Sequence, residues 1–447
     1  MRPKKQEDTQ LRVFQSRLDQ MIDMEHALVR LSDRINWQIL EKKLGEIYIP
    51  DKGRPALPTR LMAGLHYLKG LHALSDELVV EGFLENPYWQ YFCGMEFFEH
   101  RLPLDSSSMT RWRKRVGSKG FEDLLQETLR LAEDSGQLKE SDYKRVNVDT
   151  TVQEKNITHP TDAKLLCKGI ELVVRHCRRS GIPLRQTYAR LAPKALLDST
   201  RYAHARQYKK AQAQVKKLRT FLGRVLRDVK RKTMEISGGF MELLDLATRI
   251  HQQKKEDRDK LYSYFAPEVS CIAKGKAHKK YEFGCKASIV STSVGNWIVG
   301  AKVFHGNPFD GHTLAGSLSQ MERLSGHYPQ EAYCDKGYRG TKSKEGVACE
   351  VLIPGTRGKR SRTIHKFMKR RNAIEPIIRH MKSDHGMARN WLKGEDGDRI
   401  NVLMAACGFN MKKLLRAFLY LLLRSLNYIT FRAGNTNTPL MWVHAEK

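Results

Sequence analysis

The sequence predicts an α/β protein in which a mixed sheet, with helices packed on it, follows a mostly helical amino-terminal part. Helical apolar spacing runs through residues 1–140, and apolar and polar residues then alternate in KRVNVDTTV from 144. Strand character returns at 281–304 as two strands joined by an SVGN turn. The predicted order is strand, large helical insertion, hairpin, helix, strand, strand and helix, as in a mixed sheet covered by helices.

Length and composition limit the classes of protein to consider. With 447 residues, 40% hydrophobic and 29% charged, the chain is predicted to fold around a large core in two or three structural units. A formal net charge of +30 attracts a polyanion, and DNA or RNA is the commonest such partner. An anionic membrane surface is the less favoured partner, because the charge is spread along the chain rather than confined to one amphipathic helix.

Cysteine usage and apolar runs indicate a cytoplasmic protein. The eight cysteines form no C-x-x-C pair, which argues against a zinc module or a disulfide framework. The first ten residues, MRPKKQEDTQ, contain no apolar stretch of the kind found in a secretory signal. The most apolar run, at 414–426, is too short to span a bilayer and is predicted to be a core helix.

Two basic segments are candidates for contact with nucleic acid. In LDSSSMTRWRKRVG, polar residues precede a short helix that resembles the recognition element of a helix-turn-helix, with a solvated basic face as the alternative. The helical insertion, roughly 162–265, has an apolar stripe between Lys and Arg residues, which indicates a solvated helical hairpin with DNA-backbone contact as an added role. The cations of the short helix are Arg111, Arg113, Lys114 and Arg115.

Three carboxylates form the candidate catalytic set. Asp149 ends the strand-like run KRVNVDTT, and Asp335 lies where EAYCDKGY leaves a strand for a turn. Glu375 is the only acid between 357 and 382, where ten Lys or Arg surround it. For Glu375 alone, an ion pair with a neighbouring Arg is the ordinary explanation. Together, the three acids favour a site for Mg²⁺, which prefers hard oxygen ligands and can promote phosphodiester cleavage.

Other polar residues are assigned structural roles. Asp162 and Asp310 are each expected to be a cap or a turn former, and GEDGD at 394–398 is expected to be a solvated loop. The segment from about 362 to 395 is predicted to be helical. Pro376 removes a helix hydrogen bond, so this helix either kinks at Glu375 or starts there.

At these residues the chain resembles a known family. VNVDTT, CDKGYRG and RRNAIEPIIRHMK resemble the three catalytic blocks of the DDE transposases of bacterial insertion sequences, in particular the insertion-sequence-five-like group. The resemblance extends over roughly residues 30–420. It implies an RNase H-like catalytic core and implies that Asp149, Asp335 and Glu375 are both the catalytic residues and the ligands of Mg²⁺, with Mn²⁺ as a substitute.

The resemblance also implies DNA-contacting residues around these acids. Arg371, four residues before Glu375, and Lys382, seven after it, match basic positions of the family's last block and suit a phosphate clamp and a DNA-end contact. The family's usual Tyr is replaced by Met368, so Tyr338 and Arg339 are the remaining nearby candidates.

The resulting expectation is a DNA transposase that cuts the ends of its element by hydrolysis and joins the 3′-OH to target DNA. Its partners would be double-stranded DNA, as terminal inverted repeats and target, and a second copy of the chain bound on that DNA in the bacterial cytoplasm at the nucleoid. A non-cutting DNA-binding relative and a simple metal-dependent nuclease are the alternatives. The expected units are a helical DNA-binding and assembly domain (1–140), a catalytic domain with its insertion (141–430) and a tail (431–447).

Overall fold

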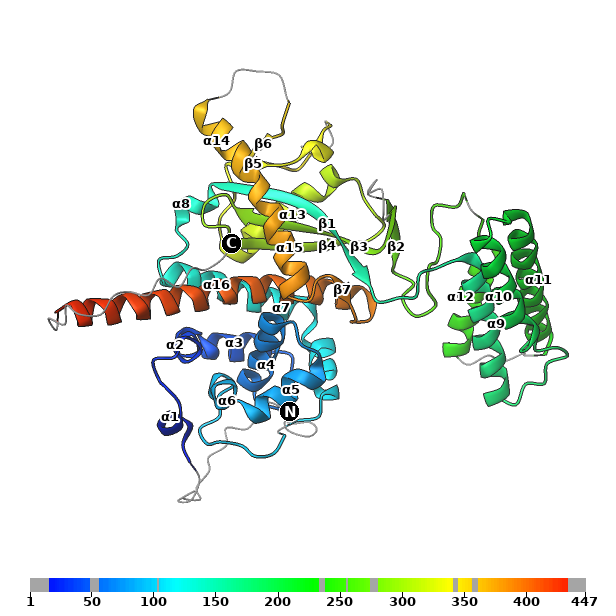
Figure 1. Ribbon diagram of the computed structural model, residues 1–447, viewed down its shortest axis with the longest axis horizontal. Helices are drawn as coiled ribbons and strands as arrows, with labels where there is room; N and C mark the ends of the chain where they lie inside the picture. Colours follow the sequence, from blue (N-terminus) through cyan, green and yellow to red (C-terminus); the bar gives the residue numbers. More distant parts are fainter. Residues whose placement is uncertain are drawn as a thin grey trace.

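The computed structural model describes residues 16–48, 56–102, 104–232, 238–254, 256–273, 280–340, 345–355 and 361–432, with side chains up to Leu419. Figure 1 shows three bodies: helices from the first third of the chain, a twisted sheet above them, and a separate four-helix bundle to the right. The long helix α16 (Gly394–Arg432) runs between the sheet and the amino-terminal helices. The expected tail from 433 onward lies outside the described residues.

In its described residues, the amino-terminal part contains eight helices. Several begin at a side chain that accepts a backbone N–H of the first turn, as Asn36, Ser75 and Asn86 do. Gly117 has a positive φ of 63° and kinks the longest of them. The helices are α1 (Leu18–Met21), α2 (Ala27–Arg34), α3 (Trp37–Gly45), α4 (Thr59–His72), α5 (Asp76–Glu85), α6 (Pro87–Phe92), α7 (Ser107–Asp134) and α8 (Glu140–Tyr143).

A seven-stranded mixed sheet forms the centre of the molecule. β1 pairs antiparallel with β3, which pairs antiparallel with β2 and β4 on its other edge, whereas β5 is parallel to β1 and β6 is parallel to β5. The short β7 is parallel to the last residues of β1. The strands are β1 (Arg145–Lys155), β2 (Ser270–Ala273), β3 (Tyr281–Thr292), β4 (Ile298–Phe304), β5 (Glu331–Tyr333), β6 (Glu350–Leu352) and β7 (Arg389–Asn390).

Helices cover both faces of this sheet. α13 (Asp310–Ser325) and α16 lie against one face, where buried Val146, Val148 and Ala332 join a core continuous with the amino-terminal helices. α14 (Arg362–Arg370) and α15 (Ile374–Asp384) lie on the other face, and α15 crosses in front of the sheet in Figure 1. The sheet is therefore buried between two helical layers, as a mixed α/β core requires.

The four-helix bundle is inserted between β1 and β2. It has its own hydrophobic core, to which the apolar stripe of α11 contributes Leu218, Leu222, Val225 and Val229. The remaining surface of α11 is basic, with ten Lys or Arg against one Asp. The bundle helices are α9 (Asp162–Arg179), α10 (Leu191–His204), α11 (Tyr208–Lys232) and α12 (Gly238–Gln252).

Two predictions about elements are wrong in detail. The segment 362–395 is not one helix: it contains α14, a 3₁₀ turn at Arg371–Ala373, α15 and the strand β7. GEDGD at 394–398 is not a solvated loop, because it forms the first turn and a half of α16 and its Asp398 is buried. The predicted core helix at 414–426 lies within α16, and Leu414 and Phe418 are buried there.

Candidate active site

Asp149 lies within β1 rather than at its end, which corrects the sequence prediction. β1 continues to Lys155, six residues further. On the edge away from β3, β5 pairs with Arg145–Asn147 and β7 pairs with Glu154–Lys155. Between these two pairings no described strand joins β1 on this edge, so the half-buried Asp149 lies beside a gap in the sheet.

Asp335 lies in the matching position on the neighbouring strand. The last pair of the parallel β1–β5 ladder is Asn147 with Tyr333, and Asp149 and Asp335 each follow that pair by two residues. Because side chains two residues apart in an extended chain point to the same face, this register places the two carboxylates side by side. Asp335 then caps a 3₁₀ turn by accepting the N–H of Gly337 at 2.8 Å.

A buried thiol lies next to both carboxylates. Burial raises the pKa of Cys334 well above its usual value, and the charges of Cys349, Asp335 and Asp149 raise it further, while Arg371 opposes them. The same thiol is therefore within electrostatic reach of both acids and of Arg371. Asp149, Asp335 and Arg371, from separate segments, thus all act on the one thiol at this end of β5.

Glu375 lies in the first turn of α15. This helix packs on β1 and buries Ile374, Ile377 and Met381, while Glu375 itself is exposed. The helix begins at Ile374, directly after the 3₁₀ turn, so Pro376 sits where a missing N–H breaks no helix bond. The sequence left open whether the helix kinks at Glu375 or starts there, and in the structure it starts there.

The start of α15 separates the two basic partners of Glu375. Lys382 is on the same helix, seven residues on and therefore on the same face. Arg371 lies in the 3₁₀ turn, donates from Nη2 to Asn372 Oδ1 at 3.1 Å, and has a buried Nε without a hydrogen-bond partner among the described residues. A buried donor of this kind suits an anionic group such as a phosphate.

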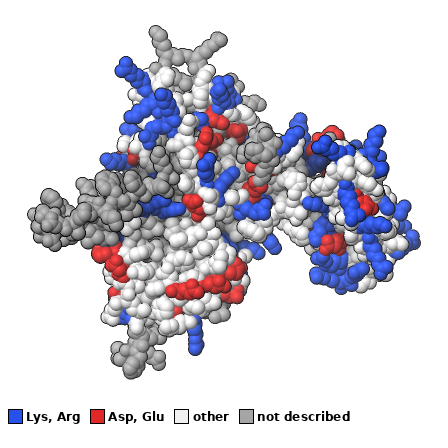
Figure 2. Space-filling view, in the orientation of Figure 1, with Lys and Arg blue, Asp and Glu red and all other residues white. Residues whose placement is uncertain are grey.

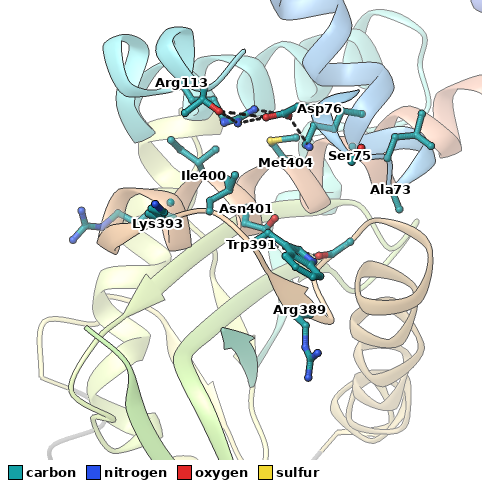
Figure 3. Close-up of a pocket in the computed structure, with 18 of the residues that line it drawn as sticks. Ala73, Ser75, Asp76, Arg113, Arg389, Trp391, Lys393, Ile400, Asn401 and Met404 are labelled. Carbon is teal, nitrogen blue, oxygen red and sulfur yellow. Dashed lines mark hydrogen bonds and ion pairs between the residues drawn. The ribbon is translucent and has the colours of Figure 1, made fainter. Parts of the chain in front are cut away.

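Tyr338 and Arg113 are corrections to the predicted DNA-contacting set. Tyr338 is fully buried in the core shared with α13, so it presents no surface to DNA. Arg113 is also buried: it makes a two-pronged ion pair with Asp76 of α5, which Lys69 joins at 2.8 Å (Figure 3). Arg111, Lys114, Arg115 and Arg339 are exposed, although Arg339 also donates to Pro354 O at 2.8 Å.

A large hollow lies elsewhere, between α4–α5 and the start of α16. Its volume is about 1390 Å³, and Trp391, with 72% of its surface exposed, lies at its edge beside Arg389 (Figure 3). Asp149, Asp335 and Glu375, all in the described part of the chain, do not line it. The three candidate acids therefore lie outside this hollow.

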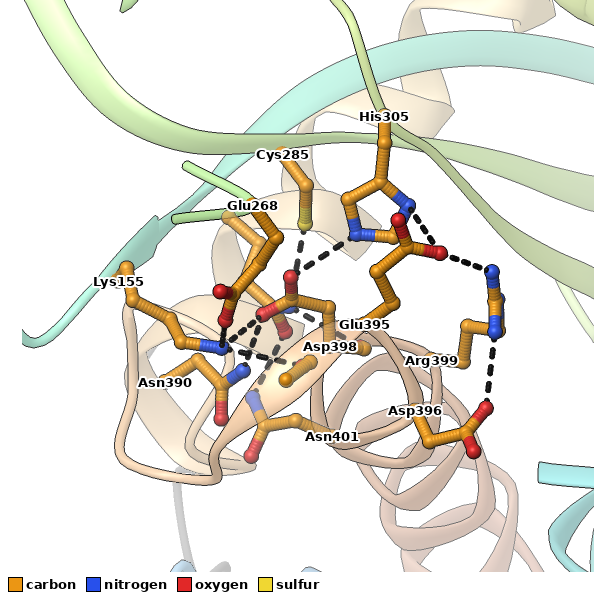
Figure 4. Close-up of polar contacts among 12 residues, drawn as sticks. Lys155, Glu268, Cys285, His305, Asn390, Glu395, Asp396, Asp398, Arg399 and Asn401 are labelled. Carbon is orange, nitrogen blue, oxygen red and sulfur yellow. Dashed lines mark hydrogen bonds and ion pairs between the residues drawn. The ribbon is translucent and has the colours of Figure 1, made fainter. Parts of the chain in front are cut away.

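Among the described residues, one group of His, Cys and acidic side chains is close enough to share an ion. Cys285, His305 and Asp398 have ligand atoms within 4.8 Å of one another. Asp398 already accepts from Lys155 at 2.8 Å, His305 at 3.0 Å and Asn390 at 2.6 Å (Figure 4), and burial raises the pKa of the Cys285 thiol. We interpret the group as a buried ion-pair network.

Asp149 and Asp335 fit a hard divalent cation better. Both offer carboxylate oxygens, the donors that Mg²⁺ and Mn²⁺ prefer, at half-buried positions on the open edge of the sheet. Glu375 adds a third carboxylate from the helix that packs on β1. Asp310, assigned only a cap or turn role from NPFDGH, lies against this site: its Oδ2 is next to Gly337, as is Asp335 Oδ1.

Two family models and one curated protein match parts of the chain. A family model described as "Transposase domain (DUF772)" matches residues 16–115, and one described as "Transposase DDE domain" matches residues 355–415, which include Glu375. The chain is 51% identical over 208 residues to "Uncharacterized protein ORF8 in nfe locus" of Rhizobium meliloti, a match that covers 46% of this chain and 100% of that relative.

Two further findings delimit this result. No solved structure matches the chain. None of the described helices is long and apolar enough to cross a membrane.

Two transposase domains, one near each end of the chain, and acidic residues on neighbouring strands lead to one assignment. The chain belongs to the DDE transposases of insertion sequences.

Proposed function

We propose that this DNA transposase uses Asp149, Asp335 and Glu375 to cut the ends of its element by Mg²⁺-dependent hydrolysis and to join the freed 3′-OH to target DNA. The observation that carries the proposal is the β1–β5 register, in which Asp149 and Asp335 occupy equivalent positions two residues beyond the last pair. We further propose that the mixed sheet is the RNase H-like core that the sequence resemblance implies.

The roles of the three acids follow from their positions. Asp149 and Asp335 would hold the metal at the gap in the sheet edge, and Glu375 would complete its ligands from α15. Mg²⁺, when bound, neutralises charge on the transferring phosphate and activates the attacking oxygen. Arg371, with its buried Nε, would orient the scissile phosphate, and Lys382 would contact the DNA end from the same face as Glu375.

DNA contact is proposed to extend well beyond the cut. Figure 2 shows Lys and Arg side chains covering the four-helix bundle, in keeping with the basic surface of α11. Arg111, Lys114 and Arg115 on α7 and Arg339 after β5 are the other exposed candidates. We propose an amino-terminal unit for end binding and assembly, followed by a catalytic unit with its insertion. Two copies on paired ends would act at the chromosome in the cytoplasm.

Strand cleavage and joining test this proposal. The substrate is a plasmid carrying the DNA that flanks the coding region, incubated with the full chain and Mg²⁺. We expect wild type to nick this DNA at the element ends and to produce joined products, and Asp335→Asn to bind the DNA but leave it intact. Asp245→Asn, an exposed change in α12, is the matched control and should retain full activity.

Each alternative has its own outcome. If wild type binds the DNA without cutting it, the chain is a non-cutting DNA-binding relative. If cut ends form but never join new DNA, it is a metal-dependent nuclease. If Asp335→Asn cuts as well as wild type, the assignment of Asp335 is wrong.

A further inference from the structure

Asp310 is an acidic residue beside the candidate site to which the catalytic scheme gives no role. It lies in the first turn of α13, and its side chain is 28% exposed. Its Oδ1 accepts two hydrogen bonds, one from the Thr150 hydroxyl and one from Lys286 Nζ, each at 2.8 Å. The two donors lie on neighbouring strands, β1 and β3. Asp310 therefore ties α13 to both strands.

Thr150 connects Asp310 with Asp149. The backbone N–H of Thr150 donates to Asp149 Oδ1 at 2.7 Å, while its hydroxyl donates to Asp310. Because the hydroxyl is fixed by Asp310, the peptide that carries this N–H is fixed as well. Thr150 therefore forms a hydrogen-bonded link between the carboxylates of Asp149 and Asp310.

Gly337 connects Asp310 with Asp335 on the other side. Asp310 Oδ2 and Asp335 Oδ1 each lie 3.0 Å from the point that a Cβ on Gly337 would occupy. The N–H of Gly337 also donates to Asp335 Oδ1 at 2.8 Å. Because Gly337 has no side chain, both carboxylates can approach the same turn.

Lys286 makes this approach of negative charges tolerable. It is 7% exposed, and its ammonium contacts Asp310 and the carbonyl oxygen of Pro308. Without this cation, the Asp310 carboxylate would lose its ion-pair partner while facing Asp335, and like charges at such distances repel. The ion pair holds Asp310 in the place from which it contacts Thr150.

We propose that Asp310, held by Lys286, is a positioning residue that fixes Asp149 relative to Asp335 and thereby sets the affinity of the site for a divalent cation. This inference rests on the proposed function, since it takes the two acids as metal ligands. Asp310 acts through Thr150 and Gly337 and does not itself hold the metal.

Mn²⁺ binding to the full chain, measured by the loss of its free electron paramagnetic resonance signal, tests the inference without catalysis. The site is defined as the Mn²⁺ binding that Asp335→Asn abolishes. Thr150→Val removes the bridging hydroxyl without changing charge. We expect it to weaken Mn²⁺ binding about five-fold, the equivalent of about 1 kcal/mol. Ser288→Ala is the matched control, because Ser288 faces Thr150 across the ladder and its buried hydroxyl has no hydrogen-bond partner among the described residues.

Lys286→Met separates positioning from simple charge. Removing a cation near two carboxylates would tighten Mn²⁺ binding if charge alone mattered. We expect binding to weaken about ten-fold, because Asp310 leaves its place and frees Thr150, and we expect Lys286→Arg to restore most of the affinity. If Lys286→Met binds Mn²⁺ as tightly as wild type or more tightly, the positioning role is refuted. The positioning role is also refuted if Thr150→Val binds Mn²⁺ as tightly as Ser288→Ala does. This second comparison decides the inference even if Lys286→Met does not fold.

Failure of the proposed function has a different signature. If wild type shows the Asp335-dependent Mn²⁺ site but never cuts DNA, the proposed reaction fails, and the Mn²⁺ affinities of the variants still decide the inference. If wild type shows no such site, the inference is overturned together with the proposed role of the two acids.

Discussion

Replacing Arg113 with methionine distinguishes a structural role from DNA contact on α7. The Arg113 side chain is 5% exposed and bonds both oxygens of Asp76, which is itself 14% exposed. Removing one partner of a buried ion pair costs about 3–5 kcal/mol, because the other charge remains buried. Since Lys69 still pairs with Asp76, we expect the lower end, about 3 kcal/mol.

This loss of unfolding free energy should be measurable by urea unfolding followed by tryptophan fluorescence. With a slope of about 2 kcal/mol per molar urea, a loss of about 3 kcal/mol moves the midpoint down by about 1.5 M. Trp112 is a suitable probe, because it is buried next to Arg113 and its ring lies 4.7 Å from that of His66. DNA affinity of the folded variant should stay at the wild-type value.

Arg111→Met is the matched control on the same helix. Arg111 is exposed and, among the described residues, its guanidinium donates to the Ser107 hydroxyl, so its loss should change stability by less than about 0.5 kcal/mol. Its effect should instead be on DNA affinity. If Arg113→Met unfolds at the wild-type urea concentration and binds DNA more weakly, the buried ion pair is not what holds this helix, and the reasoning is refuted.

Three other predictions concern pH, a second buried cation and salt. Burial and the charge of Arg113 lower the pKa of His66 to about 3, so as the pH falls the unfolded chain protonates this imidazole before the folded chain does. The free energy of unfolding should therefore fall below pH 6.5, by about 1.4 kcal/mol per pH unit. In His66→Gln, the urea midpoint should depend less on pH between 7 and 5. Lys155→Met should cost about 3–5 kcal/mol in the same assay, whereas Lys168→Met, in an exposed pair, should cost little. DNA affinity by fluorescence anisotropy should fall with salt, by about 0.9 in log affinity per log unit of salt for each phosphate contacted, and a flat response would contradict the basic-surface argument.

Sequence periodicity predicted the elements whose contacts are regular. The alternation around Val146 and Val148 predicted β1, and the stripe through Leu218 and Val225 predicted a helix whose buried face it forms. It failed for β7, because two residues carry no period and their pairing depends on β1, which lies more than two hundred residues earlier.

The same distinction applies to the candidate site. The sequence predicted Asp149 and Asp335 at strand ends as members of one metal site, although β1 continues past Asp149 to Lys155. Arg113 was misassigned, since a cation on an amphipathic helix looks the same in sequence whether water or Asp76 neutralises it. Asp310 was passed over for a similar reason: its partners Thr150 and Lys286 are remote in sequence and give no local signal.

The long β1 strand connects the candidate site with the buried network of Figure 4. β1 is joined along one edge by β3 and, on the other edge, only at its two ends by β5 and β7. Asp149 lies between those two ends, in the interval where no described strand pairs with β1 on that edge. Lys155, at the far end, bonds Asp398 of α16 and Glu268 on the return from the bundle. These contacts of Lys155 hold the end of β1 where the basic insertion leaves the sheet, six residues after Asp149. The insertion can therefore leave there without loosening the strand that positions Asp149.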